Sequence, residues 1–349
     1  RKAHRAPTPL GGGVAIWATM GLLLACGATA VAFEGRGLPA ELARHLGGLR
    51  QRAGELAGIF GLATAIMAMG LADDAVGLGW RPRLGIQLGL AAILVAAGVH
   101  VTLFGPVASP WVTGPLSVLW IVGLTNAFNF LDNMDGLAAG VGLIAAALFA
   151  FAQAAVGGLF VPAVLLILVG ALAGFLVHNR HPARLFMGDA GSNFLGFLLG
   201  ALTIAGTFTR TERGGSPYGV LTPLLVMAVP LYDTTSVILI RLRQGRSPFQ
   251  PDRSHFSHRL VERGLTPPWA VRTIDLVTLT GGLGALLLPW LGPFGASVVV
   301  MQTACLLGVV AILEISTSPE RRDGEAQRAG GPAADPRARP DAGRRAGAV

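Results

Sequence analysis

Long apolar stretches follow one another along almost the whole chain and are separated by short polar segments. Each stretch has about 20 residues, enough for a helix to cross ~30 Å of hydrocarbon. The ten-residue alternation typical of a membrane barrel does not occur. The pattern therefore predicts an all-α protein, a polytopic membrane bundle of about ten transmembrane helices. The predicted spans are residues 12–33, 56–72, 84–104, 112–131, 137–156, 159–178, 190–209, 220–240, 269–292 and 294–315.

The composition also favours a membrane over water as the solvent. Hydrophobic residues make up 52% of the 349 residues and charged residues only 13%, with a mean hydropathy of +0.59. A soluble domain would carry about 25% charge. We expect one integral membrane domain over residues 1–315. Residues 316–349 contain almost no large apolar side chain, which predicts a disordered cytoplasmic tail.

The net charge of +8 comes almost entirely from Arg, because Lys2 is the only lysine. If the basic residues 1–5 lie in the cytoplasm, so do the loops after the even-numbered spans, which carry most of the Arg side chains. This distribution follows the positive-inside rule, so the charge indicates membrane orientation and no nucleic-acid binding. Cys26 and Cys305 lie in apolar stretches and predict neither a disulfide framework nor a metal site.

Four polar clusters interrupt the apolar pattern, at residues 71–78, 126–140, 186–196 and 247–260. They follow the second, fourth, sixth and eighth predicted spans. Because each span changes the side of the membrane, all four clusters fall on the cytoplasmic face, and the parity predicts one site built from four loops. A secondary transporter, the rival from another class, would place such groups near the middle of the bilayer.

The first two clusters bring carboxylates to the membrane edge. Asp73 and Asp74 are adjacent, so their charges repel unless a divalent metal or an Arg cluster lies close. In the second cluster, amides and carboxylates recur every three residues and would share one face of a helix. These residues are Asn126, Asn129, Asp132 and Asp135. Such a stripe is typical either of a polar seam between helices or of a pocket edge that binds a ligand or a hydrated cation.

The third and fourth clusters differ in charge. Asp189 opens the seventh span, where it is either an N-cap or, beside the other carboxylates, a Mg²⁺ ligand. The fourth cluster supplies Arg253, His255 and His258, donors that suit a pyrophosphate. Two His residues with no Cys or third His nearby do not make a zinc site. Asp233, within the eighth span, either hydrogen-bonds a neighbouring helix or supports the site from behind, and we assign it no chemical role from the sequence.

Five segments that include these clusters occur in order over residues 1 to about 264. They are RKAHRAPTPLGGGVAI, LADDAVGL, NAFNFLDNMDGLAAG, FMGDAGSNFLG and SPFQPDRSHFSHRL. The ordered set resembles the polyprenyl-phosphate N-acetylhexosamine-1-phosphate transferases. The resemblance implies an enzyme of the bacterial inner (plasma) membrane whose active site faces the cytoplasm. It would transfer a sugar 1-phosphate from a UDP-sugar to undecaprenyl phosphate and release UMP, the first membrane step of cell-envelope glycan synthesis.

The resemblance also implies Mg²⁺, or Mn²⁺ in its place, and a role for each motif residue. The implied catalytic residues are Asp73, Asp74 and Asp189, with Asp189 as the metal ligand. The implied substrate-binding residues are Asn126, Asn129, Asp132, Asp135, Arg253, His255 and His258. Family members usually carry one more span before the RK-H segment, so the resemblance leaves an eleventh helix ahead of residue 1 as an open possibility.

Two features separate the branches of this family. The peptidoglycan branch, phospho-N-acetylmuramoyl-pentapeptide transferase, carries a Lys shortly after its paired Asp, and no Lys follows Asp73 and Asp74 here. The glycan-initiating branch, which uses UDP-N-acetylglucosamine or a related sugar, fits better. That branch often has a His where this chain has Ser257, so we expect Ser257→Ala to be tolerated and Ser257→His to be near neutral if the ring has room. The sequence leaves four questions open: which UDP-sugar is used, which glycan is made, whether a covalent enzyme intermediate forms, and whether the protein is a homodimer.

Overall fold

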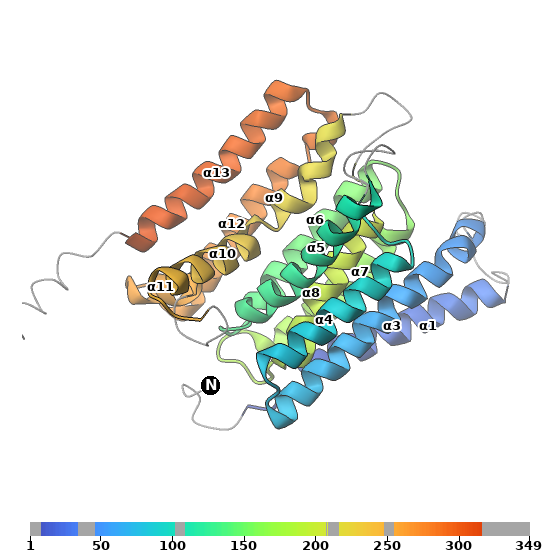
Figure 1. Ribbon diagram of the computed structural model, residues 1–349, viewed down its shortest axis with the longest axis horizontal. Coiled ribbons are helices and arrows are strands. Elements are labelled where there is room, and N and C mark those ends of the chain that lie inside the picture. Colours follow the sequence, from blue (N-terminus) through green and yellow to red (C-terminus); the bar gives the residue numbers. More distant parts are fainter. Residues whose placement is uncertain are drawn as a thin grey trace, which may run out of the picture.

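The computed structural model describes residues 8–33, 46–101, 109–206, 208, 216–247 and 255–315. These parts of the chain form helices and turns, with one isolated parallel bridge between Leu10 and Phe186 (Figure 1). The first helices are α1 (Gly12–Ala32), α3 (Leu46–Val76), α4 (Trp80–Ala96), α5 (Pro110–Leu131), α6 (Leu137–Ala155), α7 (Phe160–Asn179) and α8 (Gly188–Ala205). They are followed by η3 (Pro217–Leu221), α9 (Thr222–Val226), α10 (Ala228–Arg243), α11 (Phe256–Glu262), α12 (Pro267–Ala285), η4 (Leu288–Trp290) and α13 (Pro293–Ile315). The all-α prediction is confirmed, and the predicted tail 316–349 lies outside the described residues.

The number of membrane spans differs from the prediction. Every predicted range contains at least part of a helix, but among the described residues seven helices are long and apolar enough to cross a membrane, or eight if η3–α9 and the bent α10 count as one span. The count of about ten is therefore not confirmed. The helix α4 has only 17 residues, and α8 begins with the polar sequence GDAGSN. The chain is a multi-pass membrane protein in either count.

Helix α8 lies in the middle of the bundle, whereas α13 runs along one outer edge and α1 along another (Figure 1). Its most extensive contacts are with α3 and α5. Every residue from Ala190 to Thr203 is buried, and much of the helix consists of Gly, Ala and Leu. Close packing of small residues is the main source of helix association in a membrane. The central position of α8 fixes Asp189, in its first turn, at the meeting point of several helices.

Two glycines let neighbouring helices approach the start of α8 closely. A Cβ on Gly70 of α3 would lie 2.3 Å from the carbonyl oxygen of Asp189. A Cβ on Gly13 of α1 would lie 2.3 Å from the backbone nitrogen of Gly191. Gly12 and Gly13 also donate backbone hydrogen bonds to the 186–187 segment that precedes α8, at 2.9 and 3.0 Å. The start of α8 is thus held by backbone contacts that a larger residue would break.

We expect Gly70→Ala to destabilise the protein and to lower its activity, because the added methyl group would push the Asp189 backbone away. Overpacking of this kind typically costs about 1–3 kcal/mol. Gly61→Ala on the same helix is the matched control, since a Cβ there meets nothing within 4 Å. The measurement is the thermal midpoint of both variants in detergent. A Gly70→Ala midpoint equal to that of Gly61→Ala would contradict the close approach of α3 to α8.

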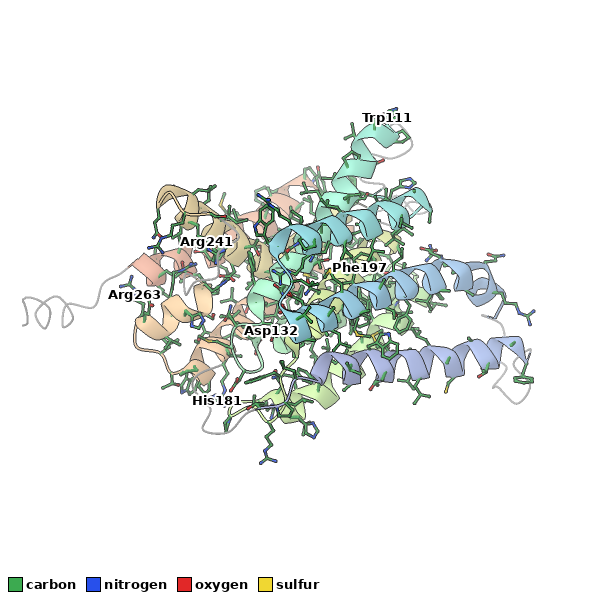
Figure 2. All side chains as sticks on the ribbon, turned by 60° about the horizontal axis from the view of Figure 1, so that its bottom comes forward. Trp111, Asp132, His181, Phe197, Arg241 and Arg263 are labelled. Carbon is green, nitrogen blue, oxygen red and sulfur yellow. The ribbon has the colours of Figure 1, made fainter. Side chains whose placement is uncertain are left out.

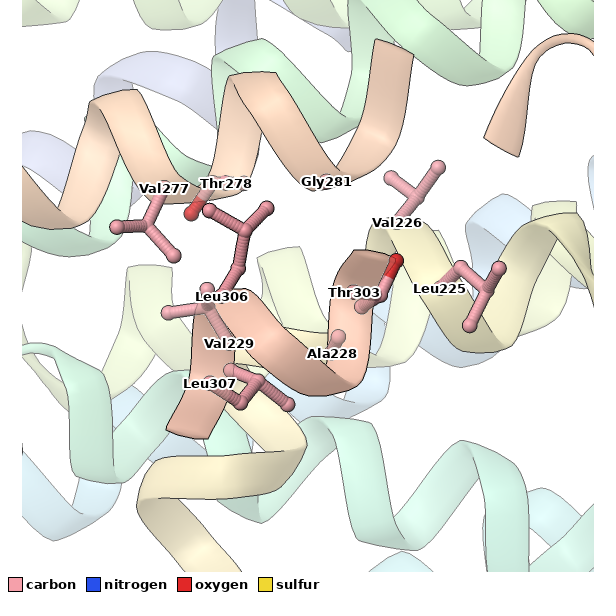
Figure 3. Close-up of a pocket in the computed structure, with 10 residues that line it drawn as sticks. All are labelled: Leu225, Val226, Ala228, Val229, Val277, Thr278, Gly281, Thr303, Leu306 and Leu307. Carbon is pink, nitrogen blue, oxygen red and sulfur yellow. The ribbon is translucent and has the colours of Figure 1, made fainter. Parts of the chain in front are cut away.

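The predicted single span 220–240 is instead a pair of helices, α9 and α10, bent by 59°. Pro230 explains the break, because it has no N–H to donate to the carbonyl of residue 226, the last residue of α9. Beside the bend is a small cavity of about 10 Å³, room for roughly one water molecule (Figure 3). Apart from Thr278 and Thr303 its lining is apolar. The cavity is too small and too apolar to be the polar site that the sequence predicts.

Candidate active site

Three carboxylates from two helices meet where α3 ends and α8 begins. Asp73 and Asp74 are in the last turn of α3, and Asp189 is in the first turn of α8. The C-terminal end of α5 lies beside them; Figure 2 shows Asp132 there, remote from Trp111 at the start of α5. The sequence predicts one site built from four polar clusters, and the structure brings residues of the first three together here.

Asp74 caps α8. Its two carboxylate oxygens accept hydrogen bonds from the backbone N–H groups of Asp189 and Ala190, both at 3.1 Å. The first N–H groups of a helix have no partner within the helix and carry its positive dipole end, so a carboxylate stabilises them. Gly188 has φ +71°, and a Cβ there would lie 2.6 Å from Asp74. The N-cap role considered for Asp189 therefore belongs to Asp74, which leaves the Asp189 side chain available for another task.

Arg83, in the first turn of α4, joins the other two carboxylates. Its Nη1 donates to Oδ2 of Asp73 and, at 3.2 Å, to Oδ2 of Asp189. From the sequence, Arg83 was expected only as one of the positive charges of the cytoplasmic loops, and its place in the site was missed. The signal was the Asp73–Asp74 pair, whose repulsion calls for a nearby cation.

Exposure distinguishes Asp189 from Asp73. The Asp73 side chain is 5% exposed, whereas that of Asp189 is 31% exposed. Asn129 of α5 donates its amide to Oδ1 of Asp189 at 3.0 Å and to the hydroxyl of Ser192 at 3.2 Å. Asp189 is consequently the carboxylate that a solvated ion can reach, and its orientation is set by Asn129 and Arg83.

A chain of amides lies behind Asp189. Asn126 donates to Oε1 of Gln87 at 2.6 Å, and Gln87 donates to Oδ1 of Asn193 at 3.1 Å. Asn193 in turn donates to the backbone carbonyl of Asp189 at 2.7 Å. Asn126, expected to bind substrate, is engaged in this network. Gln87 and Asn193 were not singled out from the sequence, although Gln87 is a polar residue inside an apolar stretch and Asn193 lies in the third polar cluster.

The predicted stripe of four polar residues does not continue as one helical face. Helix α5 ends at Leu131, and Asp132 is its C-cap residue. Asp135 accepts from the His181 ring at 2.9 Å and from the backbone N–H of Ala183 at 3.1 Å. Those contacts tie the α5–α6 turn to the α7–α8 loop. The spacing argument fails beyond Leu131 because it assumed that the helix continues.

A basic group lies on the other side of the α5 end. His255, the N-cap residue of α11, contacts the Phe130 ring edge-on with 5.6 Å between centroids. The buried guanidinium of Arg241 also lies 5.6 Å from the centre of the Phe130 ring. Arg241 was counted only as a loop charge in the sequence. His258 is half-buried on α11, and Arg253 lies outside the described residues.

The end of α5 thus separates acidic from basic side chains. Asn129 reaches toward Asp189, while its neighbour Phe130 faces His255 and Arg241. Successive residues of a helix point about 100° apart, which lets two adjacent positions serve two groups. An anionic substrate and a cation can therefore be held side by side at this end of the bundle.

The carboxylates suit a Mg²⁺ ion that takes its other ligands from water and substrate better than they suit a metal held entirely by protein side chains. In the described part of the chain, no group of three or more His, Cys, Asp or Glu residues is arranged to hold a metal by itself. Mg²⁺ typically takes one or two carboxylates and completes its shell with water and substrate phosphates. The partly exposed carboxylate of Asp189 offers such a partial, all-oxygen site.

Comparison with known proteins shows the family of this chain. Residues 56–207, which include all three carboxylates and Asn129, match the model of Glycosyl transferase family 4. A Mycolicibacterium smegmatis protein named decaprenyl-phosphate N-acetylglucosaminephosphotransferase is 36% identical, over 90% of this chain and 78% of its own length. A Bacillus subtilis protein named probable undecaprenyl-phosphate N-acetylglucosaminyl 1-phosphate transferase is 32% identical over 74% of each chain. This chain belongs to the polyprenyl-phosphate N-acetylhexosamine-1-phosphate transferase family.

Membership in the family makes the chain a phosphotransferase enzyme of the membrane. An Escherichia coli relative named undecaprenyl-phosphate alpha-N-acetylglucosaminyl 1-phosphate transferase is 28% identical over 64% of this chain and 63% of its own length. The names of these relatives agree with the glycan-initiating branch. They do not favour the peptidoglycan branch or a secondary transporter.

Proposed function

We propose that this chain transfers N-acetylglucosamine 1-phosphate from UDP-N-acetylglucosamine to a polyprenyl phosphate and releases UMP. The reaction would take place at the cytoplasmic face of the bacterial plasma membrane, as the first membrane step of cell-envelope glycan synthesis. The observation that carries the proposal is the partly exposed Asp189 carboxylate, oriented by Arg83 and Asn129, with His255 and Arg241 just across the end of α5. The names of the relatives support the reaction type.

The reaction joins two anions, so positioning and charge neutralisation supply most of the catalysis. An oxygen of the lipid phosphate attacks the β-phosphorus of the UDP-sugar and forms a new P–O bond. The bond from the β-phosphorus to the bridging oxygen breaks, and UMP leaves with that electron pair. Arg253, His255 and His258 would donate hydrogen bonds to the phosphates, while Asp132 and Asp135 would line the nucleotide pocket.

On the acidic side, Asp189 would hold Mg²⁺, or Mn²⁺, which when bound neutralises charge on the pyrophosphate. Asn129 and Arg83 keep the Asp189 carboxylate turned toward the ligand. Asp73 acts through Arg83, since it is almost fully buried and its carboxylate is engaged by that guanidinium. Asp74 holds the start of α8 in place by capping its N–H groups.

The decisive assay is release of UMP from UDP-N-acetylglucosamine by the purified protein with Mg²⁺ and a polyprenyl phosphate. Undecaprenyl and decaprenyl phosphate are assayed in parallel, because the names of the relatives differ in this lipid. We expect lipid-dependent UMP release and a preference for N-acetylglucosamine in a panel of UDP-sugars. UMP release that does not require the lipid, or no release with any sugar and lipid pair, would contradict the proposal.

The proposed topology predicts which ends of the helices face the cytoplasm. In a variant without Cys26 and Cys305, Thr266→Cys before α12 is expected to resist a membrane-impermeant thiol reagent in spheroplasts. Trp111→Cys at the start of α5, where the side chain is 89% exposed, is expected to react from outside. Both should react after lysis. Ready labelling of Thr266→Cys in intact spheroplasts would reverse the orientation.

A further inference from the structure

One buried carboxylate outside the acidic group contacts the loop that carries the histidines. Asp233 of α10 is 1% exposed. Its Oδ2 lies 3.1 Å from Nδ1 of His255, and its Oδ1 accepts the backbone N–H of Phe256 at 2.6 Å. The side chain therefore binds two consecutive residues at the start of α11.

A carboxylate buried to this extent is costly unless donors satisfy it. Here the donors are the imidazole of His255 and the first N–H of α11, where the helix dipole also favours a negative charge. When this carboxylate is ionised it can only accept hydrogen bonds, and Nδ1 of His255 is then the donor of the contact. The second nitrogen, Nε2, lies on the side of the ring away from Asp233, in a residue that is 6% exposed.

The orientation of the His255 ring is set from two sides. Asp233 holds Nδ1, and the edge-on contact with Phe130 limits rotation of the ring. Phe130 follows Asn129, the residue that binds Asp189. The position of Nε2 is thereby tied to the helix end that also orients the carboxylate of the acidic group.

We propose that Asp233 is a positioning residue that acts through His255, holding the imidazole with Nδ1 protonated and Nε2 directed toward the phosphates of the substrate. This inference rests on the proposed function for its kinetic part only. It assigns Asp233 no contact with substrate. Asp233 is expected to affect kcat only while an imidazole is present at position 255.

A second anchor of α11 provides the control. Arg259 donates to Oε1 of Glu314 on α13 at 3.1 Å and to Ser236 on α10 at 2.9 Å. Tyr232 donates to Oε2 of Glu314 at 3.0 Å. These contacts hold α11 against the bundle without touching His255. Loss of the Glu314 charge loosens the same helix and leaves the imidazole contact intact.

The kinetic test compares Asp233→Asn, His255→Ala and the double variant by kcat for UMP release at matched amounts of folded protein. In Asp233→Asn, the amide oxygen of the new side chain can still accept from the Phe256 N–H. This substitution is expected to lower kcat by ~10- to 100-fold, the loss typical of one charge-assisted hydrogen bond. In the His255→Ala background, the same substitution should change kcat by less than about 3-fold. Multiplicative losses in the double variant would overturn the proposal.

Glu314→Gln is expected to change kcat by less than about 3-fold, even if it lowers the thermal midpoint as much as Asp233→Asn does. An equal loss of kcat in Glu314→Gln and Asp233→Asn would show that general anchoring of α11 explains both, and would overturn the positioning role.

A readout without turnover separates this inference from the proposed reaction. In ¹⁵N-histidine-labelled protein, the His255 signal, assigned by its absence in His255→Ala, is expected to show a proton on Nδ1. Asp233→Asn should shift that signal toward the tautomer with the proton on Nε2. If these signals appear but the wild-type protein releases no UMP, the proposed reaction fails and the positioning contact stands. A wild-type signal with no proton on Nδ1 would refute the contact whatever the activity.

Discussion

Replacing Asp189 with Asn is expected to lower kcat/KM for UMP release by ~10²-fold or more and to weaken the dependence on Mg²⁺. Asn keeps the size of the side chain and can still accept one hydrogen bond from Asn129 or Arg83. It loses the negative charge that binds the metal, and a catalytic metal stabilises transition-state charge by several kcal/mol, which this fold-change reflects. Rates are measured over a range of Mg²⁺ concentrations.

Glu55→Gln on α3 is the matched control for loss of a carboxylate. Glu55 forms a partly exposed pair with Arg52 at 3.6 Å, and such pairs contribute little. Its kcat/KM should stay close to that of the wild-type protein. If Asp189→Asn keeps near-normal turnover with an unchanged Mg²⁺ optimum, the assignment of Asp189 as metal ligand is wrong.

Arg83→Ala is expected to have a comparable effect, ~10²-fold in kcat/KM, together with a lower thermal midpoint. The substitution leaves the carboxylates of Asp73 and Asp189 facing each other without the guanidinium that joins them. Removing one partner of a fully buried ion pair costs about 3–5 kcal/mol. The loss of stability should be smaller here, because the Arg83 side chain is 26% exposed. Activity and the thermal midpoint are measured on the same preparations.

Two further variants test whether the guanidinium of Arg83 is required, or only a positive charge in this loop. Arg83→Lys keeps the charge but cannot present the planar guanidinium, so its activity should fall between those of Arg83→Ala and the wild-type protein. Arg81→Ala removes a neighbouring Arg that stacks on Trp80, and it should be close to wild type. Equal activity of Arg81→Ala and Arg83→Ala would mean that the general positive charge of this loop matters, and not the contact with Asp73 and Asp189.

Ser257 shows that comparing motifs does not reveal how a side chain is buried and bonded. The sequence suggested that Ser257→His would be near neutral if the ring had room. The structure places Ser257 at 1% exposure, with its hydroxyl donating to Oδ1 of Asn133. A histidine would have to fit a larger ring into this buried position and would lose the hydroxyl that bonds Asn133, so the structure predicts that Ser257→His is destabilising. Ser257→Ala should cost about 1 kcal/mol, the typical net value of one hydrogen bond.

The polar residues between 126 and 135 show a second limit of predicting structure from a sequence pattern. Spacing by three predicted one helical face for the four polar residues between 126 and 135, but α5 ends at Leu131. Asn129 is the member that contacts Asp189, and Asn126 supports it from behind through Gln87. Spacing by three places residues on one face only while the helix continues, and the Asp135-Gly136 pair, a common turn signal, already marked a break in this segment.

The sequence by itself determined the all-helical membrane character, the approximate place of each helix and the polar clusters that would meet. These properties follow from the local pattern of hydrophobic and polar residues, which can be read directly along the chain. Only the tertiary structure decided which oxygen faces which donor: Asp74 on the N–H groups of α8, Arg83 between Asp73 and Asp189, and Asp233 on His255. Those pairings join residues up to 116 positions apart. They depend on close helix approach at positions such as Gly70, and no local pattern encodes that distance.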